Sequence, residues 1–121
     1  MSDIELAIIG GTGLYRLAEL ADVESLQPAT RYGVPSGPVR VGRLGMHRVA
    51  FLARHGEGHS VAPHQVNYRA NLAALKTLGA RRVLALNTVG GITERFGPRV
   101  LACPDQLIDY TSGRVSSLCD P

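Results

Sequence analysis

The chain has 121 residues, enough for one domain with a single hydrophobic core. Its formal net charge is +3, but the basic residues are scattered, which argues against a nucleic-acid binder with its clustered basic stripe. The sequence begins with no secretory signal and contains no apolar stretch of about 18 residues, so we expect a cytoplasmic protein with no membrane partner.

The first half of the chain alternates apolar runs with loops rich in glycine and proline. Residues 6–9 predict a buried strand that leads into a glycine-rich turn at 10–13, and residues 14–20 could form a short helix. Residues 27–38 predict an irregular loop because they contain several prolines and glycines. Residues 39–53 alternate apolar and polar side chains, which predicts a β-hairpin.

The second half begins with a loop at residues 54–65 that combines histidines, glycines and a proline, a chemistry more typical of a site than of a spacer. Residues 66–78 predict a helix, and residues 82–86 predict another buried strand that runs into a polar loop at 87–91. Residues 100–108 are apolar but include a proline, which favours an interrupted or edge strand. The order of elements predicts an α/β fold with a mixed sheet flanked by helices.

Polar loops therefore follow three of the predicted buried strands. Ligands of open α/β sheets bind beyond the carboxyl ends of the strands, so we expect loops 10–13, 54–60 and 87–91 to face one crevice. Each loop alone has an ordinary explanation as a tight turn, a surface pair or a helix cap. The hypothesis of a site depends on their convergence.

The side chains of these loops suit an anion of the size of phosphate. The first loop offers main-chain amides and the hydroxyl of Thr12, and successive amides can form an anion-binding concavity. The second offers Arg54, whose guanidinium can grip phosphate through paired hydrogen bonds, and His55, which can donate to a phosphate oxygen. The third offers Asn87 and Thr88 with further amides.

Two nucleotide-binding motifs fail to match. A dinucleotide fingerprint would need a glycine or alanine where Arg16 stands and an acidic residue after the next strand, which ends at Ala53-Arg54. A Walker loop would need a G-K-[ST] triplet, which the sequence lacks. We therefore expect free phosphate or a small phosphate ester as the anion.

The remaining polar residues predict no metal site. Cys103 and Cys119 form no C-x-x-C pair, and Cys103 is interpreted as a small core residue because its surroundings are apolar. The sequence leaves open whether His59 lines the site or is solvated. It also leaves open whether Asn67 and Asn71, on one face of the predicted helix, are solvated or belong to a buried network or a subunit interface.

Several of these segments together resemble a known family. Residues 8–14, I-I-G-G-T-G-L, resemble the opening strand and phosphate loop of the methylthioadenosine phosphorylases, which belong to the purine nucleoside phosphorylases. Further segments resemble that family in the same order: Ala53-Arg54-His55-Gly56, residues 63–71, residues 87–92 and residues 106–111. Residues 87–92 and 106–114 look most like the bacterial S-methyl-5'-thioinosine phosphorylase branch.

The resemblance implies a purine nucleoside phosphorylase, a pentosyltransferase of purine salvage. It implies phosphorolysis of S-methyl-5'-thioinosine or a related purine nucleoside to the free base and (methylthio)ribose 1-phosphate, with inorganic phosphate as co-substrate and no metal or redox cofactor. Thr12, Arg54 and His55 would bind phosphate. Asn87 and Thr88 match the phosphate and ribose loop, where many family members carry Thr-Ala instead.

The resemblance also sets expectations about the whole protein. Family members are about twice as long and typically trimeric, and their second half supplies the groups around ribose and purine. We therefore expect residues 1–121 to be the N-terminal part of a single phosphorylase domain, inactive alone, whose full-length parent is a homotrimer. Two alternatives remain: a non-catalytic phosphate- or nucleotide-binding α/β module, and a remnant with an open sheet edge that does not fold alone.

Overall fold

The computed structural model describes residues 4–119, and the chain divides after Asn87 into two compact units. Among the described residues, all strands and the α-helix lie in the first unit. The second unit contains the 3-10 turn η3 (Glu94–Phe96) within otherwise irregular chain. No helix in the described range is long and apolar enough to cross a membrane.

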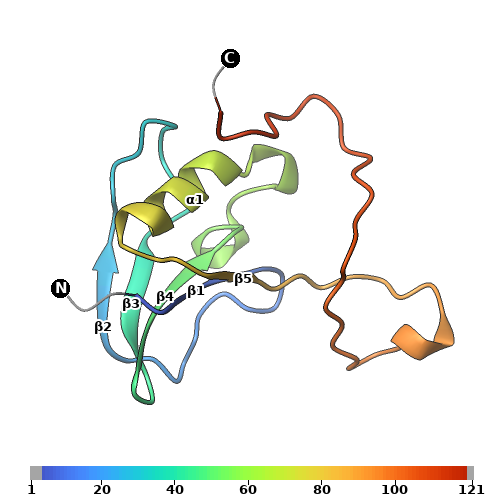
Figure 1. Ribbon diagram of the computed structural model, residues 1–121, viewed down its shortest axis with the longest axis horizontal. Helices are drawn as coiled ribbons and strands as arrows, with labels where there is room; N and C mark the ends of the chain where they lie inside the picture. Colours follow the sequence, from blue (N-terminus) through green and yellow to red (C-terminus); the bar gives the residue numbers. More distant parts are fainter. Residues whose placement is uncertain (1–3, 120–121) are drawn as a thin grey trace. The chain divides into compact units, whose positions relative to one another are not determined.

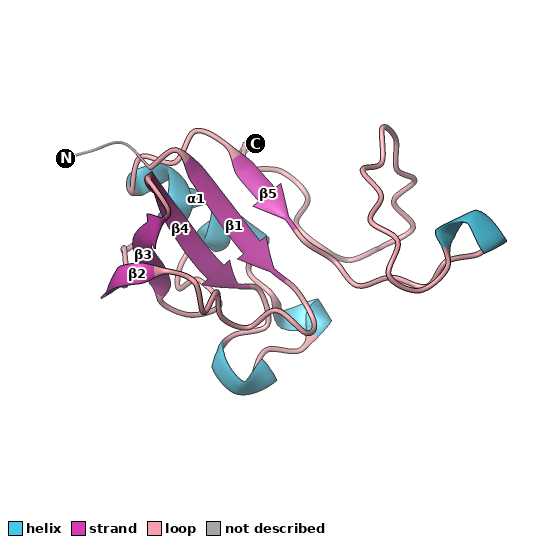
Figure 2. Cartoon of the chain, turned by 90° about the horizontal axis from the view of Figure 1, so that it is seen from below, coloured by secondary structure: helices cyan, strands magenta, loops and turns pink. Residues whose placement is uncertain are grey.

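The first unit is built on a five-stranded sheet, and its mixture of parallel and antiparallel pairing was predicted. Its strands are β1 (Leu6–Gly10), β2 (Ala21–Leu26), β3 (Val39–Leu44), β4 (His47–Ala53) and β5 (Val83–Ala85), in the order β2-β3-β4-β1-β5. Strand β1 pairs in parallel with β4 and with β5, whereas β2, β3 and β4 are antiparallel neighbours. In Figure 2 the arrowheads of β4, β1 and β5 point the same way. The sheet also confirms the predicted hairpin at residues 39–53.

Helix α1 (Tyr68–Thr77) covers one face of this sheet (Figure 1). Its Ala74 and Leu75 are buried in one cluster with Ile9, Ala50 and Leu52, side chains of β1 and β4. The helix begins after Asn67, whose side chain accepts a hydrogen bond from the Ala70 N–H and so satisfies a backbone donor of the first turn. The predicted helix at residues 66–78 is confirmed, with slightly shorter bounds.

The other face of the sheet is covered by an irregular segment where a short helix was expected. Leu14, Leu17 and Leu20 pack against a buried cluster that includes Ile8 and Phe51. The prediction of a helix at residues 14–20 is wrong, because so short a helix is marginal by itself and the packing of the leucines onto the sheet decides the conformation. Strand β2, which follows, was missed because it is an edge strand whose side chains are mostly exposed.

Two predictions of burial are also wrong. Strand β5 forms, but as a sheet edge, and Val83 is 45% exposed and Leu84 46%. Residues 100–108 form no strand, because within the described part of the second unit no neighbouring strand pairs with them. Cys103 in this segment is exposed and is not a core residue.

Candidate functional site

The sheet brings together the starts of the three loops singled out from the sequence. Gly10, at the end of β1, is in register with Ala53 at the end of β4, and Ile9 with Ala85 at the end of β5. Two backbone hydrogen bonds extend this ladder: the Arg54 N–H donates to the Gly10 carbonyl and the Leu86 N–H to the Ile9 carbonyl, each at 2.9 Å. The three chain segments therefore leave the sheet side by side, at the carboxyl ends of β1, β4 and β5.

Arg54 connects the three segments directly. Its Nη1 donates a hydrogen bond to Oδ1 of Asn87, which follows β5. Its Nη2 lies so close to Gly11, which follows β1, that a Cβ there would be 2.7 Å away. A side chain at position 11 would displace the guanidinium, so glycine lets the positive charge rest against the main chain of the first loop. Because arginine has five N–H donors, the bond to Asn87 orients the group and leaves others for a ligand.

The other predicted residues are placed as follows. Thr12 directly follows Gly11 and is exposed. His55 directly follows Arg54 and is only 5% exposed. Thr88 follows Asn87 in sequence but belongs to the second unit. The structure thus brings Arg54 and Asn87 into contact, with Thr12 and His55 adjacent in sequence to residues of that cluster.

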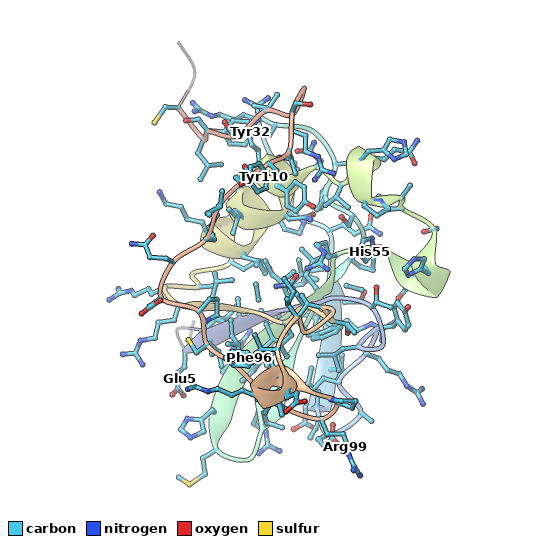
Figure 3. All side chains as sticks on the ribbon, turned by 90° about the vertical axis from the view of Figure 1, so that its right-hand side faces the viewer. Glu5, Tyr32, His55, Phe96, Arg99 and Tyr110 are labelled. Carbon is cyan, nitrogen blue, oxygen red and sulfur yellow. The ribbon has the colours of Figure 1, made fainter. Side chains whose placement is uncertain are left out.

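His55 is held in one ring orientation by its own loop. Its Nδ1 lies 3.0 Å from the carbonyl oxygen of Val61, and a carbonyl can only accept, so Nδ1 carries the proton of this bond. The Val61 N–H in turn donates to the His55 carbonyl at 2.8 Å. Nε2 is therefore the ring nitrogen left to meet a ligand, and in the neutral imidazole it accepts a hydrogen bond, for which a P–OH group of phosphate is a suitable donor. Figure 3 shows His55 at the opposite end of the sheet from Glu5, which precedes β1.

His59 packs beside His55 and connects it to the segment after β1. The two imidazole rings have centroids 4.8 Å apart, and His59 Nδ1 lies 3.1 Å from the hydroxyl of Tyr15, within hydrogen-bond distance. His59 adopts a φ of 58°, a left-handed conformation that is costly for a side chain with a Cβ. Tyr15 was missed from the sequence because it matches no motif, and its contact spans 44 residues.

The loop after β4 is also tied to the antiparallel part of the sheet. It contains the 3-10 turns η1 (Glu57–His59) and η2 (Pro63–Gln65). The carboxylate of Glu57 in η1 accepts a hydrogen bond from Arg40 of β3, which offsets its negative charge. In the described part of the chain, no three His, Cys, Asp or Glu side chains gather in a way that could hold a metal ion. Among the predicted site residues, the contacts place the Arg54 guanidinium, a group that binds anions, against Gly11 of the first loop and Asn87 of the third.

Comparison with known proteins connects the sequence to one family. The family model described as phosphorylase superfamily matches residues 5–119. A probable S-methyl-5'-thioinosine phosphorylase from Xanthomonas campestris is 70% identical over 98% of this chain and 48% of its own length. Its counterpart in Xylella fastidiosa strain 9a5c is 65% identical over 99% of this chain and 51% of its own length. The chain therefore spans about half the length of these curated relatives.

Solved structures give the same relationship over part of the chain. A methylthioadenosine phosphorylase from an antarctic soil metagenomic library matches with a TM-score of 0.63 and 46% identity, over 70% of this chain and 30% of that one. A mutant adenosine/methylthioadenosine phosphorylase from Schistosoma mansoni, in complex with adenine, matches with a TM-score of 0.65 and 41% identity, over 69% and 29%. The fold predicted from the sequence is confirmed over these parts.

Proposed function

The chain belongs to the phosphorylase superfamily, and on that premise we propose that it supplies the phosphate-binding part of a purine nucleoside phosphorylase. The observation that carries this proposal is the position of Arg54. Its guanidinium bonds to Asn87 and rests against Gly11, so one permanent positive charge lies where three strand-end loops meet. Relatives at 65–70% identity that are named as probable S-methyl-5'-thioinosine phosphorylases support the choice of reaction.

The proposed reaction is phosphorolysis of S-methyl-5'-thioinosine or a related purine nucleoside. An oxygen of phosphate forms a bond to C1′ of the ribosyl group while the bond from C1′ to the purine breaks. The electron pair of that bond leaves with the base, which takes up the proton that hydrogen phosphate gives up. The products are the free purine and (methylthio)ribose 1-phosphate. Thr12, Arg54 and His55 would bind and orient the phosphate. Asn87 and Thr88 would form part of the loop that binds phosphate and ribose. The guanidinium also holds the negatively charged phosphate, which is the nucleophile, beside the positive charge that develops on the ribosyl group.

The proposal extends to the whole protein. Because the chain spans about half the length of its relatives, we propose that residues 1–121 form the N-terminal part of a single phosphorylase domain and do not complete the reaction alone. The full-length protein would act as a homotrimer in purine salvage. A cytoplasmic location stays a prediction from the sequence.

A phosphorolysis assay tests the proposal. Methylthioinosine, inosine and methylthioadenosine are each offered to this chain and to a chimera that continues into the second half of the Xanthomonas campestris relative. We expect product only from the chimera, only with phosphate present, and none after Arg54→Ala. Arg81→Ala is the matched control. Arg81 is an exposed arginine that precedes β5, whereas Asn87, the partner of Arg54, follows β5 at the other end of the strand.

Three outcomes would count against this function. Turnover without phosphate would show that the reaction does not use phosphate bound at this site. Binding of NAD would favour a dinucleotide-binding module. Phosphate binding without product from the chimera would favour the non-catalytic phosphate-binding module.

A further inference from the structure

The buried side chain of Asn71 holds the loop before β3 against helix α1. Asn71 is 2% exposed, and a buried amide is costly unless its polar atoms are hydrogen-bonded. Its Oδ1 accepts a hydrogen bond from the Ser36 N–H at 2.8 Å, and its Nδ2 donates to the Ser36 hydroxyl at 3.0 Å. Two bonds to one residue fix both the position and the orientation of Ser36 relative to the helix.

Ser36 in turn lies against the glycine that follows His55. A Cβ at Gly56 would lie 2.9 Å from the Ser36 carbonyl oxygen and 2.7 Å from Oγ of Ser60. Gly56 also has a φ of 72°, a conformation that favours glycine. The Gly56 backbone therefore fits closely between Ser36 and Ser60, and a displacement of Ser36 changes the space available to it.

The contact reaches His55 through a short and constrained piece of chain. Gly56 is the covalent neighbour of His55, and its N–H donates to the Ala53 carbonyl at 3.0 Å. His55 and Val61 exchange two hydrogen bonds, one through the imidazole and one through the backbone. Because Gly56 is covalently joined to His55, we expect a shift at Gly56 to move the His55 backbone and with it the hydrogen bonds that orient the ring.

We propose that Asn71 is a positioning residue for phosphate binding, which acts through Ser36 and Gly56 on His55 without touching the ligand. This inference rests on the proposed function in one respect, that His55 binds phosphate. It adds a residue of helix α1 to a site otherwise built from strand-end loops. It also explains why an amide side chain occupies a position in the buried face of that helix.

Asn67, the residue that caps the start of the same helix, provides a matched control. Its Nδ2 donates to the Tyr32 carbonyl at 2.8 Å, and its Oδ1 caps the helix at the Ala70 N–H. It therefore ties the same loop to the same helix, but at Tyr32 and not at Ser36. Loss of either asparagine should destabilise the fold, whereas only loss of Asn71 should disturb Gly56.

The experiment titrates inorganic phosphate into the wild-type chain and into Asn71→Ala, Ser36→Ala and Asn67→Ala, by calorimetry and by NMR of backbone amides. We expect Asn71→Ala to raise the phosphate Kd by about tenfold, the scale of one weakened charge-assisted hydrogen bond. Ser36→Ala keeps the bond from its N–H and should raise Kd by only about two- to threefold. Asn67→Ala should leave Kd unchanged. Before phosphate is added, the Gly56 amide resonance should move in Asn71→Ala and stay in place in Asn67→Ala.

The outcomes separate this inference from the function on which it rests. If the wild-type chain binds no phosphate, both the proposed function and the inference about Asn71 are contradicted. If the wild type binds and Asn71→Ala binds equally well, or if Asn67→Ala weakens binding as much, the inference alone is overturned. If Asn71→Ala does not fold, Ser36→Ala decides, because an unchanged Kd and an unmoved Gly56 resonance in that variant contradict the proposal.

Discussion

The two units of the chain contain similar kinds of residues but bury them very differently. In the first unit Phe51 and Leu75 are 1% exposed and Leu52 is fully buried, because side chains from two layers meet at the sheet. In the second unit Ile92 is 100% exposed and Leu101 is 94% exposed. Apolar content therefore does not by itself produce a core: a residue is buried only where a second layer of structure is available to cover it.

The largest expected effect comes from removing a buried ring in the first unit. Phe51→Ala should lower the free energy of unfolding by about 3–5 kcal/mol, because it loses apolar burial and leaves a cavity. Leu101→Ala in the second unit should change it by less than about 0.5 kcal/mol, because that side chain is exposed. Urea unfolding followed by circular dichroism measures both. Similar losses in the two variants would show that the second unit has a core of its own.

A smaller effect should separate two glycines of similar sequence context. Gly11→Ala places a Cβ 2.7 Å from both the Arg54 guanidinium and the Leu86 carbonyl, and such overpacking should destabilise the fold by about 1–3 kcal/mol. Gly90 lies in the corresponding loop of the second unit, and a Cβ there meets no atom within 4 Å. Gly90→Ala should therefore be close to neutral. The same urea titration tests this pair, and equal losses would contradict the close packing around Gly11.

The smallest effect concerns two carboxylates and the pH dependence of stability. A hydrogen bond from the His47 side chain lowers the pKa of Glu5, and Nδ1 of His47 lies 2.8 Å from Oε2. A lowered carboxyl pKa stabilises the folded state above the ordinary pKa of the group, and the effect is lost as the pH falls through the folded value. Glu5→Gln should therefore lower stability slightly at pH 7 and not at all in strong acid.

Asp109 in the second unit provides the contrast. Hydrogen bonds from the hydroxyl and the N–H of Thr111 lower the pKa of Asp109, but they join residues only two apart in the sequence. Such a local turn can form without a folded core. Asp109→Asn should therefore leave the pH profile of unfolding unchanged. If Asp109→Asn changes the pH dependence of the free energy of unfolding more than Glu5→Gln does, the expected difference between the two units is contradicted.

The parts of the fold predicted from the sequence are those with a strong local pattern. The hairpin and helix α1 carry clear periodicity, and the rule that ligands bind beyond strand ends predicted that Arg54 and Asn87 would lie close together. The failures depend on partners distant in sequence. Strand β2 forms because β3 pairs with it, and Cys103 is exposed because no layer covers it.

The same limit applies within the site. The contact of Tyr15 with His59 joins residues 44 apart in the sequence, and that of Ser36 with Asn71 joins residues 35 apart. Neither pair matches a motif, so only the folded chain reveals them.

The central claim is that the three strand-end loops hold one inorganic anion, with Arg54 as its main counter-charge. A phosphate titration of the chain, followed by the backbone amide resonances of residues 11–12, 54–55 and 87, tests it most directly. The account predicts that these resonances shift together with a single Kd, and that Arg54→Ala raises this Kd by at least about tenfold while Arg81→Ala does not. Shifts with different Kd values at the three loops, or unchanged binding in Arg54→Ala, would contradict it.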